Sequence, residues 1–124
     1  MIDIHTHPVM ITELLKSDPA LERSIHDVFG FHFPPQPLEG FLLEMDEAGI
    51  ETAVLLPIDC STAHGCRIVS NEQIADLVEK TPRFIGFASV DPNLPDAPRR
   101  LEEAVRSLGL RGLPRRRKRR ARAR

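Results

Sequence analysis

The chain begins Met1-Ile2-Asp3-Ile4-His5-Thr6-His7-Pro8, and this stretch determines how the rest of the sequence is interpreted. Side chains alternate between the two faces of an extended strand. Asp3, His5 and His7 are therefore predicted to share one face, and the two isoleucines the other, where helices would cover them. Two imidazoles that lie this close together can bind one divalent cation. The stretch predicts a strand that carries a candidate metal site made of His5 and His7.

Length and composition are those of one soluble domain. A chain of 124 residues can bury a core, and 41% hydrophobic with 28% charged residues is an ordinary balance. No apolar stretch is long enough to cross a membrane. Asp3 and the early histidines are incompatible with the apolar part of a secretory leader. We therefore expect a cytoplasmic protein.

The two cysteines, Cys60 and Cys66, are separated by five residues. For a chain without an export signal, the spacing favours two reduced thiols. The alternative is a metal-binding pair, with His64 between the two thiols as a further ligand.

Charge divides the chain into two unlike parts. Residues 1–113 contain all 18 acidic residues and nine basic ones, whereas residues 114–124 contain eight basic residues and no acidic one. An acidic body with a net charge of −9 therefore precedes a short basic tail with a net charge of +8.

Residues 9–36 show no sustained hydrophobic period. We predict a long connection there, with one short helix at residues 11–16. It contains His26 and His32, which are expected to face solvent or pack locally. The alternative is that they reach toward a metal or a substrate.

From residue 37 onward, helical and strand patterns alternate. Apolar residues at helical spacing predict helices, and short apolar runs without alternation predict strands that are buried on both faces. Ser70 with Gln73 forms a capping box, and Asp96 lies near another cap. The predicted elements are a helix at 38–48, a strand at 52–56, a loop at 57–67, a helix after Ser70, a strand at 84–90, a helix with the apolar stripe Leu101, Ala104, Val105 and Leu108, and a fourth strand that begins near Leu110. This alternation predicts an α/β fold with a parallel sheet.

Four segments resemble one family in the same order along the chain. Ile2-Asp3-Ile4-His5-Thr6-His7-Pro8 resembles the first strand of the amidohydrolase superfamily, most closely its amidohydrolase-related branch, which includes aminocarboxymuconate-semialdehyde decarboxylase. The other three segments that resemble this branch are Met45-Asp46-Glu47-Ala48-Gly49-Ile50-Glu51-Thr52-Ala53-Val54, Phe84-Ile85-Gly86-Phe87-Ala88-Ser89-Val90-Asp91-Pro92 and Leu108-Gly109-Leu110-Arg111-Gly112-Leu113. Two other families share the His-x-His opening, the polymerase-and-histidinol-phosphatase family and the TatD-type nucleases, but they fit the sequence less well.

The resemblance implies a (β/α)8 barrel with its active site at the carboxyl ends of the strands. It also implies that His5 and His7 bind a divalent metal, most often Zn²⁺, which activates a water for the hydrolysis of a small-molecule substrate. The alternative within the family is a metal-dependent decarboxylase. Asp91 would point toward the active-site end, but the resemblance assigns it no role, and the catalytic residues stay unknown.

The resemblance covers less than a whole barrel, which takes about 250 residues. Residues 1–113 would supply about three and a half βα units, and the family's further metal ligands would lie beyond Leu113. We therefore expect a truncated barrel without turnover, which self-associates through its open sheet edges.

The basic tail begins where a buried fourth strand should continue. We expect that the reading frame changes near Leu113, or that the chain is truncated there. Translation of the DNA beyond codon 113 in the other two frames tests this. The alternative, of another class, is a non-catalytic protein whose genuine basic tail binds nucleic acid or another polyanion.

Overall fold

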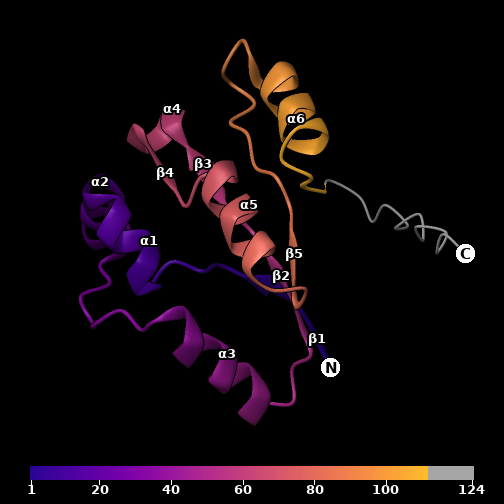
Figure 1. The fold of residues 1–124 in the computed structure, drawn as a ribbon. Coiled ribbons are helices and arrows are strands. Elements are labelled where there is room, and N and C mark those ends of the chain that lie inside the picture. The colour runs from indigo at the N-terminus through magenta and orange to yellow at the C-terminus, as the bar shows by residue number, and fades with distance from the viewer. Residues whose placement is uncertain (112–124) are drawn as a thin grey trace, which may run out of the picture.

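A parallel sheet lies at the centre of the computed structural model, which describes residues 1–111 (Figure 1). Within these residues the sheet has three strands, β1 (Ile2–Thr6), β2 (Thr52–Leu55) and β5 (Phe84–Gly86), in the order β1-β2-β5. Arg111 adds an isolated parallel bridge to Phe87 beside β5. The predicted mixed α/β fold with a parallel sheet is confirmed, and neighbours in the sheet follow chain order.

The central strand β2 is buried on both faces, as its apolar run predicts. Ala53, Val54 and Leu55 are all buried, and each pairs with a residue of β5. On its other side, β2 pairs with β1 through Ile2 and Thr52 at the start of the strands. The hydrophobic core therefore surrounds the middle of the sheet.

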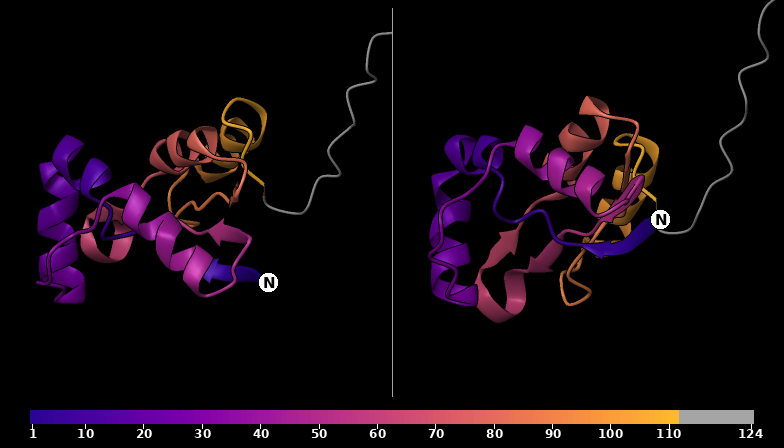
Figure 2. Two further views of the ribbon diagram at one scale, coloured as in Figure 1. Left: turned by 60° about the horizontal axis from the view of Figure 1, so that its bottom comes forward. Right: turned by 90° about the horizontal axis from the view of Figure 1, so that it is seen from below.

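Three longer helices cover the sheet: α3 (Leu38–Glu47), α5 (Asn71–Lys80) and α6 (Ala97–Arg106). All three lie on the same side of β1 in the right-hand view of Figure 2. The predicted capping box at the start of α5 is present, because the Ser70 and Gln73 side chains each accept a hydrogen bond from the other residue's backbone N–H. Asp96 precedes α6 as predicted, but its carboxylate pairs with Arg100 and makes no cap hydrogen bond.

The connection at residues 9–36 is more ordered than predicted. It folds into α1 (Thr12–Ser17), α2 (Pro19–Ser24) and a π-helical turn, η1 (Ile25–Phe29). The Asp18 carboxylate accepts a hydrogen bond from the Leu21 N–H at 3.0 Å, which caps α2 just before Pro19. The Asp-Pro helix start and the apolar spacing are the sequence signals for these helices, which the prediction did not include. The buried positions are Ile11, Leu14, Leu15, Leu21 and Ile25.

The prediction of a loop at residues 57–67 is wrong. The segment forms an antiparallel hairpin of β3 (Ile58–Cys60) and β4 (Cys66–Ile68), joined by the single helical turn α4 (Ser61–His64) and by Gly65 at φ 66°. Each strand has three residues, too few for a hydrophobic period to be recognised in the sequence.

Two predicted burial patterns are also wrong within the described residues. Ile2 and Ile4 are 60% and 74% exposed, because no described helix covers the outer side of β1, and Leu101 of the predicted α6 stripe is 40% exposed. The strand predicted at 84–90 is shorter than expected. It ends at Gly86 and is followed by the Phe87 bridge to Arg111, and at Ser89 the backbone hydrogen-bonds the Asn71 side chain instead of a neighbouring strand.

Within residues 1–111, no helix is both long and apolar enough to span a membrane. The basic tail at 114–124 and the end of the predicted fourth strand lie outside the described residues.

Candidate metal centre

His5 and His7 lie side by side at the carboxyl end of β1, as the strand alternation predicts. Their Nε2 atoms are 2.9 Å apart, and their ring centroids are 4.8 Å apart with an angle of 81° between the planes. Both side chains are exposed. The structure therefore brings together the two residues that were predicted as metal ligands.

A bulge in β1 lies within the same stretch. Asp3 pairs with Ala53 and Thr6 pairs with Leu55, so β1 has one more residue than β2 between the two pairings. Bulges bend a strand locally and change the direction of its side chains. The Asp3 carboxylate accepts a hydrogen bond from the His5 backbone N–H at 3.0 Å, which stabilises the backbone at the bulge. The sequence alone does not indicate the bulge, because strand pairing creates it.

The neighbouring strand determines the tautomer of His7. The His7 Nδ1 lies 2.8 Å from the carbonyl oxygen of Leu56, which directly follows β2. A carbonyl can only accept a hydrogen bond, so Nδ1 carries a proton, and in the neutral ring Nε2 then carries the lone pair. The Leu56 N–H donates to the Thr6 carbonyl at 2.8 Å, which holds the accepting residue in register with β1. Histidines that bind metals are usually oriented in this way, by a hydrogen bond to the other ring nitrogen.

The geometry fits a shared metal ion with a small adjustment. Two nitrogens bound to one tetrahedral zinc lie about 3.3 Å apart, from Zn–N distances of about 2.0–2.1 Å. The 2.9 Å between the two Nε2 atoms corresponds instead to a hydrogen bond from His5 to His7. To bind a metal, His5 would move its proton to Nδ1 and the rings would separate slightly.

The described residues supply only these two ligands. Within residues 1–111, no group of three or more His, Cys, Asp or Glu side chains is arranged to hold a metal ion. A catalytic zinc site usually has three protein ligands. The pair is therefore a partial site as far as the described chain extends.

The other predicted candidates lie in separate places. His26 and His32 pair with each other, with ring centroids 5.0 Å apart, next to a row of phenylalanines. Cys60 and Cys66 face each other across the β3–β4 hairpin, and in the part of the chain that the structure describes they form no three-ligand cluster with His64.

Asp91 is buried and anchors a loop to α4. Its carboxylate accepts hydrogen bonds from the Thr62 N–H at 2.7 Å and the Asn93 N–H at 2.9 Å. Hydrogen bonds from the Thr62 side chain, and then from the backbone of Asn93 and Thr62, lower the pKa of Asp91 to about 2. Its carboxylate is used for these structural hydrogen bonds.

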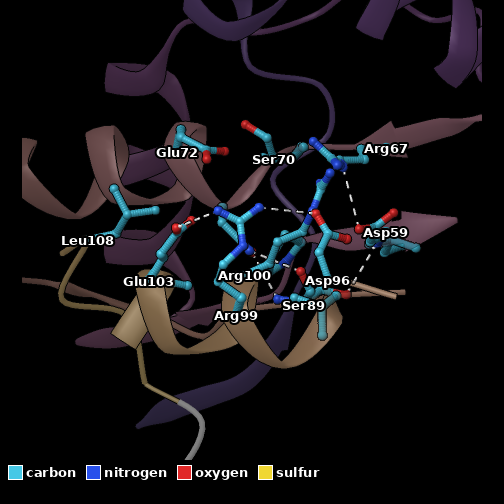
Figure 3. Close-up of a pocket in the computed structure, with 16 residues that line it drawn as sticks. Asp59, Arg67, Ser70, Glu72, Ser89, Asp96, Arg99, Arg100, Glu103 and Leu108 are labelled. Atoms are coloured by element: carbon cyan, nitrogen blue, oxygen red, sulfur yellow. Dashed lines mark hydrogen bonds and ion pairs between the residues drawn. The ribbon is translucent and has the colours of Figure 1, made fainter. Parts of the chain in front are cut away.

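A cavity of about 260 Å³ between the hairpin, α5 and α6 was not predicted from the sequence (Figure 3). Its three arginines pair with acidic side chains of the same cavity: Arg67 with Asp59 at 3.4 Å, Arg100 with Asp96 at 2.6 Å and Arg99 with Glu103 at 3.3 Å. The arginines are therefore neutralised within the cavity, and neither His5 nor His7 lines it.

No protein-family model, no curated protein and no solved structure matches this chain.

Proposed function

We propose that this chain forms the first strands of a metal-dependent hydrolase of the amidohydrolase-related type, with His5 and His7 as two of its zinc ligands. The observation that carries the proposal is the convergence of the two Nε2 atoms at the end of β1, with His7 oriented by the Leu56 carbonyl. A pair of exposed histidines on an ordinary surface strand does not require an orienting hydrogen bond from the next strand.

The order of the strands supports a barrel. Sequential parallel strands that keep chain order, with helices on one side, are how a (β/α)8 barrel is built. In doubly wound sheets the strand order reverses at a switch point instead. Here β1, β2, β5 and the Arg111 bridge show no reversal.

The placement of the pair also agrees with the proposal, because barrel enzymes use the carboxyl ends of their strands for catalysis. Bound zinc would supply a Lewis acid that activates a water at neutral pH. His5 and His7 would hold the metal through Nε2, and the Leu56 carbonyl would keep the His7 ring in position. A metal-dependent decarboxylase would use the same pair, so metal binding by His5 and His7 is common to the two activities.

Zinc binding tests the proposal directly. Competition against a chromophoric chelator measures the zinc affinity of the full 124-residue chain. The double variant His5→Ala/His7→Ala is expected to lose at least about tenfold in affinity. The matched control is His26→Ala/His32→Ala, which removes the other histidine pair and should bind zinc as the unchanged chain does. A second control, Cys60→Ser/Cys66→Ser, measures any contribution from the thiols.

Equal zinc affinity in the His5→Ala/His7→Ala variant would contradict the proposal. A second measurement needs no substitution: nitrogen-15 NMR of the metal-free chain should show His7 protonated at Nδ1. A His7 ring protonated at Nε2 would contradict the orienting role of Leu56.

A further inference from the structure

Cys60 and Cys66 are direct neighbours in the β3–β4 hairpin. They pair with each other across the two antiparallel strands, and their Sγ atoms are 3.4 Å apart. Both thiols are free and half-buried. They are the two cysteines of the chain, so any disulfide within one molecule must join them.

The backbone geometry suits a disulfide. Residues directly opposite in an antiparallel pair have Cα atoms about 4.5 to 5.5 Å apart, within the range of about 4.4 to 6.8 Å that disulfides span. A bond requires the sulfurs to approach to about 2.05 Å. Rotation of the side chains can supply this approach while the strands stay paired.

The two thiols differ in access. Cys66 lines an open cavity of about 400 Å³ together with Asp18, Ser61 and Arg67, and Cys60 is not among the residues that line it. The Cys60 S–H donates to the Cys66 carbonyl at 3.1 Å. Burial, followed by the hydrogen bond with Cys66, raises the pKa of the Cys60 thiol to about 11. Cys60 is therefore the poorer first nucleophile, because it does not line the open cavity and its S–H is held by the Cys66 carbonyl.

We propose that Cys60 and Cys66 form a redox-sensitive dithiol that low-molecular-weight disulfides, such as glutathione disulfide, oxidise to an internal disulfide. The Cys66 thiolate attacks one sulfur of glutathione disulfide and expels one glutathione thiolate. Cys60 then loses its proton, attacks the Cys66 sulfur of the mixed disulfide and expels the second glutathione thiolate. Two protein thiols are oxidised, one glutathione disulfide is reduced to two glutathiones, and the protons released by the protein thiols balance the two thiolates.

The oxidised form would tie β3 to β4 across the α4 turn. It would also remove the S–H donor from the Cys66 carbonyl, next to the ion pair of Asp59 with Arg67. The proposal does not depend on zinc at His5 and His7, because it uses neither histidine.

Intact mass spectrometry of the full chain tests the proposal. The reduced protein is equilibrated in glutathione buffers that contain an increasing proportion of glutathione disulfide. The reaction is quenched with an alkylating agent, and the intact mass of the protein is measured. The unchanged chain is expected to become a monomer that is lighter by two hydrogens and takes up no alkyl group. The Cys60→Ser variant should stop as a mixed disulfide with one glutathione. The Cys66→Ser variant should react at least about tenfold more slowly.

Two results would overturn the proposal. One is a wild-type chain that stays reduced, or that collects glutathione adducts or linked dimers, in buffers that fully modify Cys60→Ser. The other is that the two single variants react with glutathione disulfide at equal rates, which would rule out Cys66 as the preferred first nucleophile. Circular dichroism of each variant verifies folding, and the wild-type mass measurement tests the internal bond without any substitution.

Discussion

At the scale of single residues, backbone groups orient the polar side chains near the ends of the strands. The Leu56 carbonyl selects the tautomer of His7, and backbone N–H groups of Thr62 and Asn93 surround the carboxylate of Asp91. In each case a residue distant in sequence, or a turn, supplies the partner. The residue type alone therefore identifies a candidate side chain, but it does not predict the tautomer or the ionisation of that side chain.

Asp91 predicts a specific acid sensitivity. Its pKa falls from 3.8 to about 2 on folding, so its ionised form stabilises the fold fully above about pH 4, and this contribution is lost as the pH falls toward 2. We expect Asp91→Asn to lower the urea midpoint at pH 7, and the difference from the unchanged chain to shrink steadily between pH 4 and pH 2. Urea unfolding followed by circular dichroism measures both.

The control for this prediction is Asp76→Asn, which removes one negative charge from an exposed position on α5. It should leave the midpoint at pH 7 nearly unchanged. A difference between Asp91→Asn and the unchanged chain that stays constant down to pH 2 would show that the Asp91 carboxylate contributes by packing and not by charge.

At the scale of elements, α5 packs closely on the end of β5. A Cβ atom added at Gly86 would lie 2.6 Å from the Leu110 Cδ2 and 2.7 Å from the Ile74 Cγ2, both shorter than van der Waals contact. The strand needs glycine there because the helix and the start of the next segment leave no space. The segment Phe84-Ile85-Gly86-Phe87 thus has a packing reason for its glycine.

Gly86→Ala is therefore expected to destabilise the chain by about 1–3 kcal/mol, because overpacking forces side chains or backbone to shift. Chemical denaturation measures the change. The matched control is Gly40→Ala in α3, where the new Cβ would lie 3.3 Å from the movable end of the Gln36 side chain. Alanine in a helix is favoured over glycine by up to about 1 kcal/mol, so the control should be neutral or stabilising. Equal effects of the two substitutions would refute the packing argument.

At the scale of the whole molecule, β1 is an open edge. Within residues 1–111 it pairs with β2 on one side, and Ile2 and Ile4 remain exposed. A strand edge with exposed apolar side chains and unpaired backbone groups is a template for pairing with another chain. Self-association through this edge therefore stays a prediction of the fold.

Sedimentation velocity over a range of concentrations measures this association. We expect the unchanged chain to form larger species as concentration rises, and Ile4→Lys to shift the distribution toward monomer, because a lysine on an edge strand opposes pairing. The control is Leu43→Lys, which replaces another exposed apolar side chain, 57% exposed, that lies on the helix α3 and not on a strand. A monomeric unchanged chain at all concentrations would contradict the prediction.

The sequence by itself determined the elements whose signals are local. The helix that starts after Pro37, the Ser70–Gln73 capping box, the buried run of β2 and the facing pair His5 and His7 all follow from spacing within a few residues. Tertiary structure decided the rest, because strand pairing and packing join segments that lie far apart along the chain. Examples are the bulge in β1, the His7 tautomer selected by Leu56 and the hairpin that brings Cys60 to Cys66.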